Sequence, residues 1–99
     1  MIINKTQENE KLIFNLEGRL DTTTAPLLQQ TLIPAFDNAK EVTLDFKKLA
    51  YISSAGLRIL LLGQKKAKAK NASMSLCNVS AEIMEIFDIT GFSNILTVF

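Results

Sequence analysis

The segment from Leu49 to Arg58, which reads LAYISSAGLR, constrains the fold more than any other stretch of this sequence. It begins as an apolar run that is typical of a buried strand, and the run breaks at Ser53-Ser54. A helical pattern follows directly, because Leu57 and Leu61 lie one helical turn apart. The pattern therefore predicts a strand, a very short junction and a helix that has a serine at its N-terminus.

Ser54 is the residue that we expect to cap this helix. Its hydroxyl can accept a hydrogen bond from the free backbone N–H of Gly56 or Leu57. The helix start also carries the positive end of the helix dipole, so a phosphate on Ser54 would be tolerated and would change the surface charge. No capping box is present, because the third residue after Ser54 is neither Glu nor Gln. The residues alone leave a structural cap and a modified serine as alternatives.

The length and composition favour one compact domain over residues 1–99. A chain of 99 residues that is 47% hydrophobic can bury a core without a disulfide or a metal. The only cysteine, Cys77, is interpreted as a small buried hydrophobic residue, which favours a reducing compartment. The N-terminus turns polar too early for a secretory signal, and no apolar run approaches the roughly 18 residues of a membrane span. We expect a cytoplasmic protein that has no membrane partner.

Several kinds of chemistry lack their usual residues. The sequence has no histidine, which excludes Ser-His-Asp and Cys-His sites and the imidazole ligands of most metal centres. It also lacks the glycine-rich phosphate-binding motifs of nucleotide enzymes. A formal net charge of +1 argues against electrostatic binding of nucleic acid, and Lys65, Lys66, Lys68 and Lys70 are interpreted as a solvated helix end. We therefore expect no enzyme activity, no cofactor, no metal and no nucleic-acid partner.

The first half of the chain predicts a β-hairpin followed by a helix. Strands are expected at Ile2 to Thr6 and at Leu12 to Leu16, with the polar turn Gln7 to Glu10 between them. Gly18 to Asp21 is expected to close the second strand. The helix is expected from Ala25 to Asn38, with Pro26 accepted in its first turn and Pro34 kinking or splitting it.

The second half alternates strands and helices. Such alternation after a hairpin implies an α/β fold with a mixed, mostly parallel sheet of four to five strands. The expected elements are a strand from Glu41 to Phe46 before a turn at Lys47-Lys48, the helix from Ser54 to about Lys70, a strand from Ser73 to Cys77, a helix capped by Ser80 that runs through Ile89 and stops at Gly91, and a short strand from Ile95 to Phe99.

Three stretches together resemble a known family in order and spacing. They are Gly18-Arg19-Leu20-Asp21, Leu49 to Arg58, and the segment IFDITGF from Ile86 to Phe92. On these residues the chain resembles the STAS domain family and is similar to the bacterial anti-sigma factor antagonists over nearly its whole length. The resemblance implies the STAS fold, in which a mixed, mostly parallel sheet opens with a β-hairpin and packs against α-helices.

The resemblance also implies a phosphorylated serine. In that family a D-S-[ST]-G-L motif at a helix start carries a serine that is phosphorylated by the partner, an anti-sigma factor that is itself a serine kinase. Ser54 matches this serine and Gly56-Leu57 match the residues that end the motif, whereas Ser53 replaces the usual Asp and Ala55 replaces Ser or Thr. Ser53 thereby becomes a rival acceptor, and the motif alignment favours Ser54.

The segment from Gly18 to Asp21 resembles a family segment, G-E-[IL]-D, that lies near the phosphoserine and helps to contact the kinase. Arg19 replaces the usual Glu, and this charge reversal can change the choice of partner. The alternative is a turn that uses the backbone freedom of Gly18. The partner-binding residues that the resemblance implies are Gly18, Arg19, Leu20, Asp21, Ser53, Ser54, Ala55, Gly56 and Arg58.

Gly56 has two explanations at this stage. The absence of a side chain could let the backbone of a partner approach the acceptor hydroxyl, or it could allow close packing of the helix on a strand of the same chain. The residues do not decide between them.

The resemblance implies a partner-switching regulator. Unphosphorylated, the protein would bind the anti-sigma factor kinase and displace a sigma factor; phosphorylation of Ser54 would switch binding off, and a metal-dependent serine phosphatase would reset the cycle. We expect a monomer. The alternative is a STAS subunit of a transporter or larger assembly, such as a lipid-transport ABC complex, in which Ser54 is never phosphorylated. Weak nucleotide binding is a third possibility, which no phosphate loop supports.

Overall fold

The sheet contains five strands in the order β1-β2-β3-β4-β5, in a computed structural model that describes residues 1–99. β1 pairs with β2 in antiparallel fashion, and the other neighbouring strands are parallel. The prediction of a mixed, mostly parallel sheet opened by a hairpin is therefore confirmed. The strands are β1 (Ile2–Glu8), β2 (Lys11–Leu20), β3 (Glu41–Ile52), β4 (Ser73–Cys77) and β5 (Thr97–Val98).

The opening hairpin has longer strands and a tighter turn than the sequence suggested. Only Asn9 and Glu10 connect β1 to β2, and Asn9 has a positive φ of 56°, a conformation that asparagine tolerates better than most residues. Gly18, with φ of 105°, lies inside β2 where its register with β3 shifts. Such an irregularity accommodates the glycine without ending the strand, so β2 continues to Leu20.

The predicted turn at Lys47-Lys48 is wrong, because the predicted strand from Glu41 to Phe46 and the strand-like run that begins at Leu49 form one strand, β3. The strand continues to Ile52, and Lys47 and Lys48 form part of it in place of a turn. Both lysines are exposed, and the partner register shifts beside them, which breaks the usual alternation of buried and exposed residues. Because two adjacent exposed lysines do not follow the alternation of a strand, the sequence pattern indicated a turn at this point.

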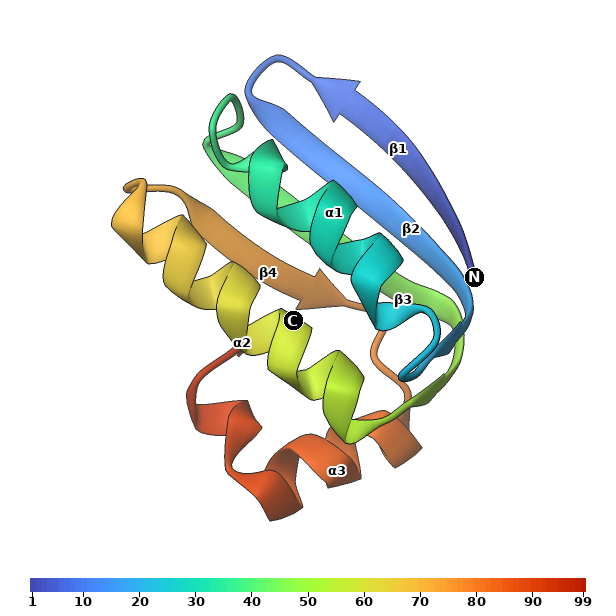
Figure 1. Ribbon diagram of the computed structural model, residues 1–99. Helices are drawn as coiled ribbons and strands as arrows, with labels where there is room; N and C mark the ends of the chain where they lie inside the picture. Colours follow the sequence, from blue (N-terminus) through green and yellow to red (C-terminus); the bar gives the residue numbers. More distant parts are fainter.

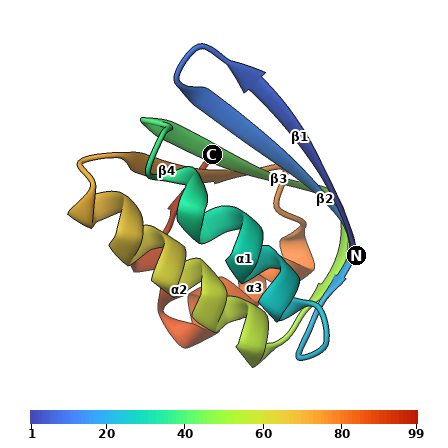
Figure 2. The same ribbon diagram turned by 45° about the horizontal axis from the view of Figure 1, so that its top comes forward.

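Three α-helices and a short 3-10 helix complete the fold: α1 (Ala25–Ala35), α2 (Ser54–Ala69), α3 (Ala81–Thr90) and η1 (Phe92–Asn94). Helices α1 and α2 lie side by side over one face of the sheet, and α3 lies near the end where α2 begins (Figures 1 and 2). None of the helices combines the length and the apolar character that crossing a bilayer requires.

Two helix predictions can be compared directly with the structure. Helix α1 ends at Ala35, before the predicted Asn38, and Pro34 lies in its last turn without splitting it. Pro34 removes only the one hydrogen bond that its N–H would have donated to the Gln30 carbonyl, and the helix ends one residue later. The prediction for α3 is confirmed, since the Ser80 hydroxyl accepts a hydrogen bond from the Ile83 N–H at 3.2 Å. Gly91 ends α3 in the left-handed conformation with φ of 82°.

The hydrophobic core lies between the sheet and the helices. Alternate residues of a strand point to the same face, so one face of each central strand is apolar. The largest fully buried side chains are Phe14, Leu16, Leu20, Leu28, Leu32, Val42, Leu44, Phe46, Leu60, Met74, Leu76 and Phe87. This core fixes the end of β2, the end of β3 and the start of α2 relative to one another.

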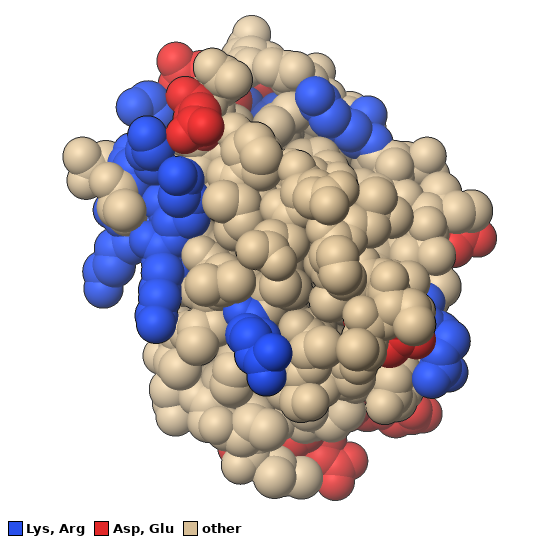
Figure 3. Space-filling view, viewed as in Figure 1, with Lys and Arg blue, Asp and Glu red and all other residues tan.

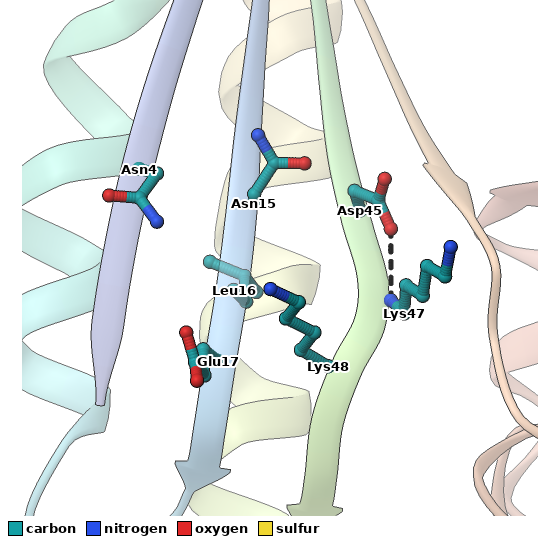
Figure 4. Close-up of a pocket in the computed structure, with 7 residues that line it drawn as sticks. All are labelled: Asn4, Asn15, Leu16, Glu17, Asp45, Lys47 and Lys48. Atoms are coloured by element: carbon teal, nitrogen blue, oxygen red, sulfur yellow. Dashed lines mark hydrogen bonds between the residues drawn. The ribbon is translucent and has the colours of Figure 1, made fainter.

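The opposite face of the sheet is polar and uncovered. Asn4, Asn15 and Asp45 are partners in one cross-strand row, and Figure 4 shows their side chains on the side away from the helices. Asp45 accepts hydrogen bonds from the Lys47 N–H and the Asn78 side-chain amide. Cys77, paired with Asp45 in the register, is half-buried, so it is less buried than the interpretation as a small buried hydrophobic residue predicted.

Candidate functional site

The transition from β3 to α2 takes a single residue. β3 ends at Ile52, Ser53 adopts an extended conformation with φ of −105° and ψ of 176°, and α2 begins at Ser54. The Ser53 N–H donates a hydrogen bond to the carbonyl oxygen of Leu20 at 2.9 Å. This bond attaches the junction to the end of β2, so two of the three segments on which the resemblance rests, Gly18 to Asp21 and Leu49 to Arg58, lie side by side.

The prediction that Ser54 is the N-cap is wrong. Ser53 occupies the N-cap position, and Ser54 is the first residue of the helix. Neither predicted side-chain cap bond forms, and the Leu57 N–H donates instead to the carbonyl oxygen of Ser53 at 3.0 Å. The first turn of α2 is therefore closed by the backbone carbonyl of Ser53, and no serine hydroxyl accepts a hydrogen bond there.

The two serines differ in access. Ser54 is exposed, and its hydroxyl takes part in no hydrogen bond within the chain. Ser53 is half-buried, and its Oγ is buried without a hydrogen-bond partner. An enzyme can therefore reach the Ser54 hydroxyl from solvent, whereas the Ser53 oxygen becomes accessible only if the junction moves.

Gly56 is buried beneath the junction. A Cβ atom at this position would lie 2.7 Å from Leu20 Cγ and 2.9 Å from Ile52 Cγ1. Of the two explanations for this glycine, the structure supports close packing on the chain's own strands. Leu20 is also fully buried at 0% exposure. We therefore place Leu20 and Gly56 beneath the expected partner-binding surface, which they support, and not among the residues that contact a partner directly.

A hydrogen-bonded turn follows β2. Asp21 Oδ1 accepts hydrogen bonds from the Thr23 hydroxyl at 2.7 Å, the Thr23 N–H at 3.0 Å and the Thr24 N–H at 3.2 Å. These bonds, led by that of the Thr23 hydroxyl, lower the pKa of Asp21 although partial desolvation opposes them. The Thr24 hydroxyl donates to the carbonyl oxygen of Arg19 at 2.8 Å. The turn is therefore anionic at neutral pH and anchored to β2.

Arg19 makes contacts that sequence reasoning missed. Its guanidinium carbon lies 4.2 Å from the centroid of the Tyr51 ring, and its Nε lies 3.6 Å from Asp21 Oδ2. Arg19 and Tyr51 are partners in the parallel pairing of β2 with β3. Only the pairing of β2 with β3 could have identified Tyr51 as a neighbour of Arg19. That pairing could not be predicted while a turn was expected at Lys47-Lys48.

Other surface features lie elsewhere. A shallow hollow of about 280 Å³ occupies the uncovered sheet face, and Figure 4 shows its lining residues Asn4, Asn15, Leu16, Glu17, Asp45, Lys47 and Lys48. The lysine-rich end of α2 forms a basic area over the helix layer (Figure 3), where Lys66 and Lys70 lie 4.0 Å and 3.2 Å from Asp37. No group of three or more His, Cys, Asp or Glu side chains is arranged to hold a metal ion.

The fold and the junction define a small α/β domain with an exposed serine at a helix start. Residues 2–99 match the STAS domain, and the chain belongs to this family. The chain is 30% identical over 94 residues to the anti-sigma-B factor antagonist of Bacillus subtilis (strain 168), which covers 95% of this chain and 85% of that protein.

Solved structures agree on the fold. The unphosphorylated form of the anti-sigma factor antagonist SpoIIAA superposes with a TM-score of 0.80 at 17% identity, covering 99% of this chain and 87% of that one. The phosphorylated form of SpoIIAA from Bacillus gives 0.78 at 17% identity, covering 99% and 91%. A sulfate transporter family protein from Wolinella succinogenes gives 0.82 at 20% identity, covering 96% and 80%.

Proposed function

We propose that this protein is an anti-sigma factor antagonist that works as a phosphorylation-controlled binding protein. Unphosphorylated, it binds an anti-sigma factor that is also a serine kinase, and the bound sigma factor is released. Phosphorylation of Ser54 ends this binding. The observation that carries the proposal is the exposure of Ser54 as the first residue of α2, beside the end of β2.

The family relationship supports both parts of the proposal. A relative at 30% identity is named an anti-sigma-B factor antagonist. The structural neighbour SpoIIAA, itself an anti-sigma factor antagonist, has been solved in unphosphorylated and phosphorylated forms. The binding surface proposed for this chain includes the exposed residues Arg19, Ser54 and Arg58 and the half-buried residues Asp21 and Ala55.

The switch follows from the charge that phosphate adds. A phosphoserine carries about −1.5 to −2 charges at neutral pH, and a tightly fitted partner surface must either desolvate this charge or exclude it. A cost of only ~3 kcal/mol weakens binding roughly a hundredfold, which is sufficient to release the kinase. A metal-dependent serine phosphatase then restores the binding form.

Intact-mass measurement after incubation with ATP and a kinase-type anti-sigma factor encoded near this gene tests the proposal. The wild-type protein and Ser53→Ala should each gain one phosphate, and Ser54→Ala should gain none. A protein that gains no phosphate from any such kinase would support the alternative, a STAS subunit without a phosphorylation switch. Phosphate transfer to Ser53 alone would also overturn the proposal.

A further inference from the structure

We infer that Arg19 is a pre-positioned anchor for a carboxylate side chain of the anti-sigma factor, and that Tyr51 is a positioning residue that holds Arg19 in place. This inference rests on the proposed function and names the chemistry of the partner surface. It begins from the stacked pair at the ends of β2 and β3.

The contacts of Arg19 leave its binding groups free. The guanidinium carbon lies over the Tyr51 ring at 4.2 Å from its centroid, and the ion pair with Asp21 engages Nε at 3.6 Å. The side-chain hydrogen bonds of this region involve Asp21, Thr23 and Thr24, and none of them comes from a terminal amino group of Arg19, whose side chain is 62% exposed. The guanidinium is therefore oriented from two sides while its outer edge remains available.

That outer edge matches a carboxylate. A planar guanidinium binds a carboxylate through two parallel hydrogen bonds, which gives orientation as well as attraction. Holding the side chain in place beforehand reduces the entropy lost on binding. The neighbouring Asp21 carboxylate is already negative, so a singly charged carboxylate is repelled less than a doubly charged phosphate.

The anchor lies next to the proposed phosphorylation site. Arg19 precedes Leu20, whose carbonyl oxygen accepts the hydrogen bond of the Ser53 N–H, and Ser54 follows directly. A kinase that contacts Ser54 and also extends over the ends of β2 and β3 would cover the Arg19 side chain. An acidic side chain on the kinase at this position would bind Arg19, and a basic one would be repelled.

Arg58 provides an internal control, because it is the only other arginine of the chain. It is also exposed, yet no aromatic ring stacks on it and no carboxylate pairs with it. The two arginines thus carry the same charge and differ in whether they are held in place.

A titration with the peptide hexaglutamate, followed by NMR of the arginine Nε–H signals, tests the anchor without the kinase. The Arg19 signal should reach half-saturation at a peptide concentration about fivefold lower than the Arg58 signal. Tyr51→Leu should remove this difference, and Tyr51→Phe, which keeps the ring, should preserve it. Equal titration of the two arginines in the wild-type protein would overturn the inference.

Binding to the kinase that phosphorylates Ser54 provides the second arm. Arg19→Glu should weaken affinity by about thirtyfold or more, since it removes the attraction and adds a like charge. An Asp→Arg or Glu→Arg change on the kinase should restore binding of this variant. If Arg19→Glu binds within twofold of the wild type, the inference fails while phosphorylation of Ser54 still supports the proposed function. If Ser54 receives no phosphate, the proposed function fails. The peptide titration alone then decides whether Arg19 is an anchor for carboxylates.

Discussion

The Ser53 N–H donates a hydrogen bond to the carbonyl oxygen of Leu20, at 2.9 Å, and so joins the start of α2 to the end of β2. This bond places two segments that are far apart in the sequence on one corner of the molecule. The exposed residue of the serine pair, Ser54, and the stacked residue Arg19 are both next to it. The proposed binding surface depends on this junction.

Gly56→Ala tests the packing beneath the junction. The added Cβ would meet Leu20 Cγ at 2.7 Å, so the variant should lose about 1–3 kcal/mol of unfolding free energy, measured by urea denaturation. Gly63→Ala is the matched control in the same helix, because its Cβ would meet Leu32 Cδ2 at 2.7 Å. Only Gly56→Ala should shift the methyl signals of Leu20. Unchanged stability of both variants would contradict the packing explanation.

The turn at Asp21 predicts a pH dependence of stability. The pKa of Asp21 is lowered in the folded protein from its ordinary value of 3.8, so its contribution to stability is complete above the unfolded pKa. The contribution is lost as pH falls through the folded pKa. Urea denaturation below about pH 4 should show this loss in the wild type and not in Asp21→Asn. Thr23→Val, which removes the leading hydrogen bond, should show a smaller loss than the wild type.

A phosphate on Ser54 should interact with Arg58. The two residues are one turn apart on α2 and both are exposed, with the acidic group nearer the helix start, which is the favourable orientation. In protein carrying phosphoserine at this position, Arg58→Gln should raise the second phosphate pKa by about 0.3 units, as measured by phosphorus NMR. Lys65→Gln, farther along α2, should leave it unchanged. An unchanged value in Arg58→Gln would show that the pair does not form.

Cys77 should alkylate slowly although it is not fully buried. Desolvation raises the pKa of its thiol, and the nearby Asp45 charge adds to the effect, so less thiolate is present at neutral pH. Its reaction with iodoacetamide should be slower than that of the urea-unfolded protein at the same pH. Asp45→Asn should increase the rate in the folded protein. An equal rate in folded and unfolded protein would contradict a raised pKa of the Cys77 thiol in the fold.

The elements that sequence reasoning predicted well are those with local signals. The hairpin follows from alternating residues around a polar turn, and α3 is bounded by the cap Ser80 and the left-handed Gly91. Each signal lies within a few residues of the feature that it predicts, so no knowledge of the fold was needed.

The features that sequence reasoning missed depend on pairing between distant segments. The continuity of β3 through Lys47 and Lys48 requires the shifted register with β2, and that register also brings Tyr51 to Arg19. The N-cap was misplaced by one residue because Ser53 remains extended while its N–H bonds to Leu20. Serines at both positions look equivalent until β2 is in place.

The affinities of the anti-sigma factor kinase for Ser54→Ala and Ser54→Asp test the central claim most directly. We predict that Ser54→Ala binds as tightly as the unphosphorylated protein and is not released by ATP, because it cannot accept phosphate. Ser54→Asp should bind much more weakly, since its negative charge stands in for part of the phosphate charge. Two affinities that agree within a factor of two would contradict the proposal that charge at Ser54 controls binding.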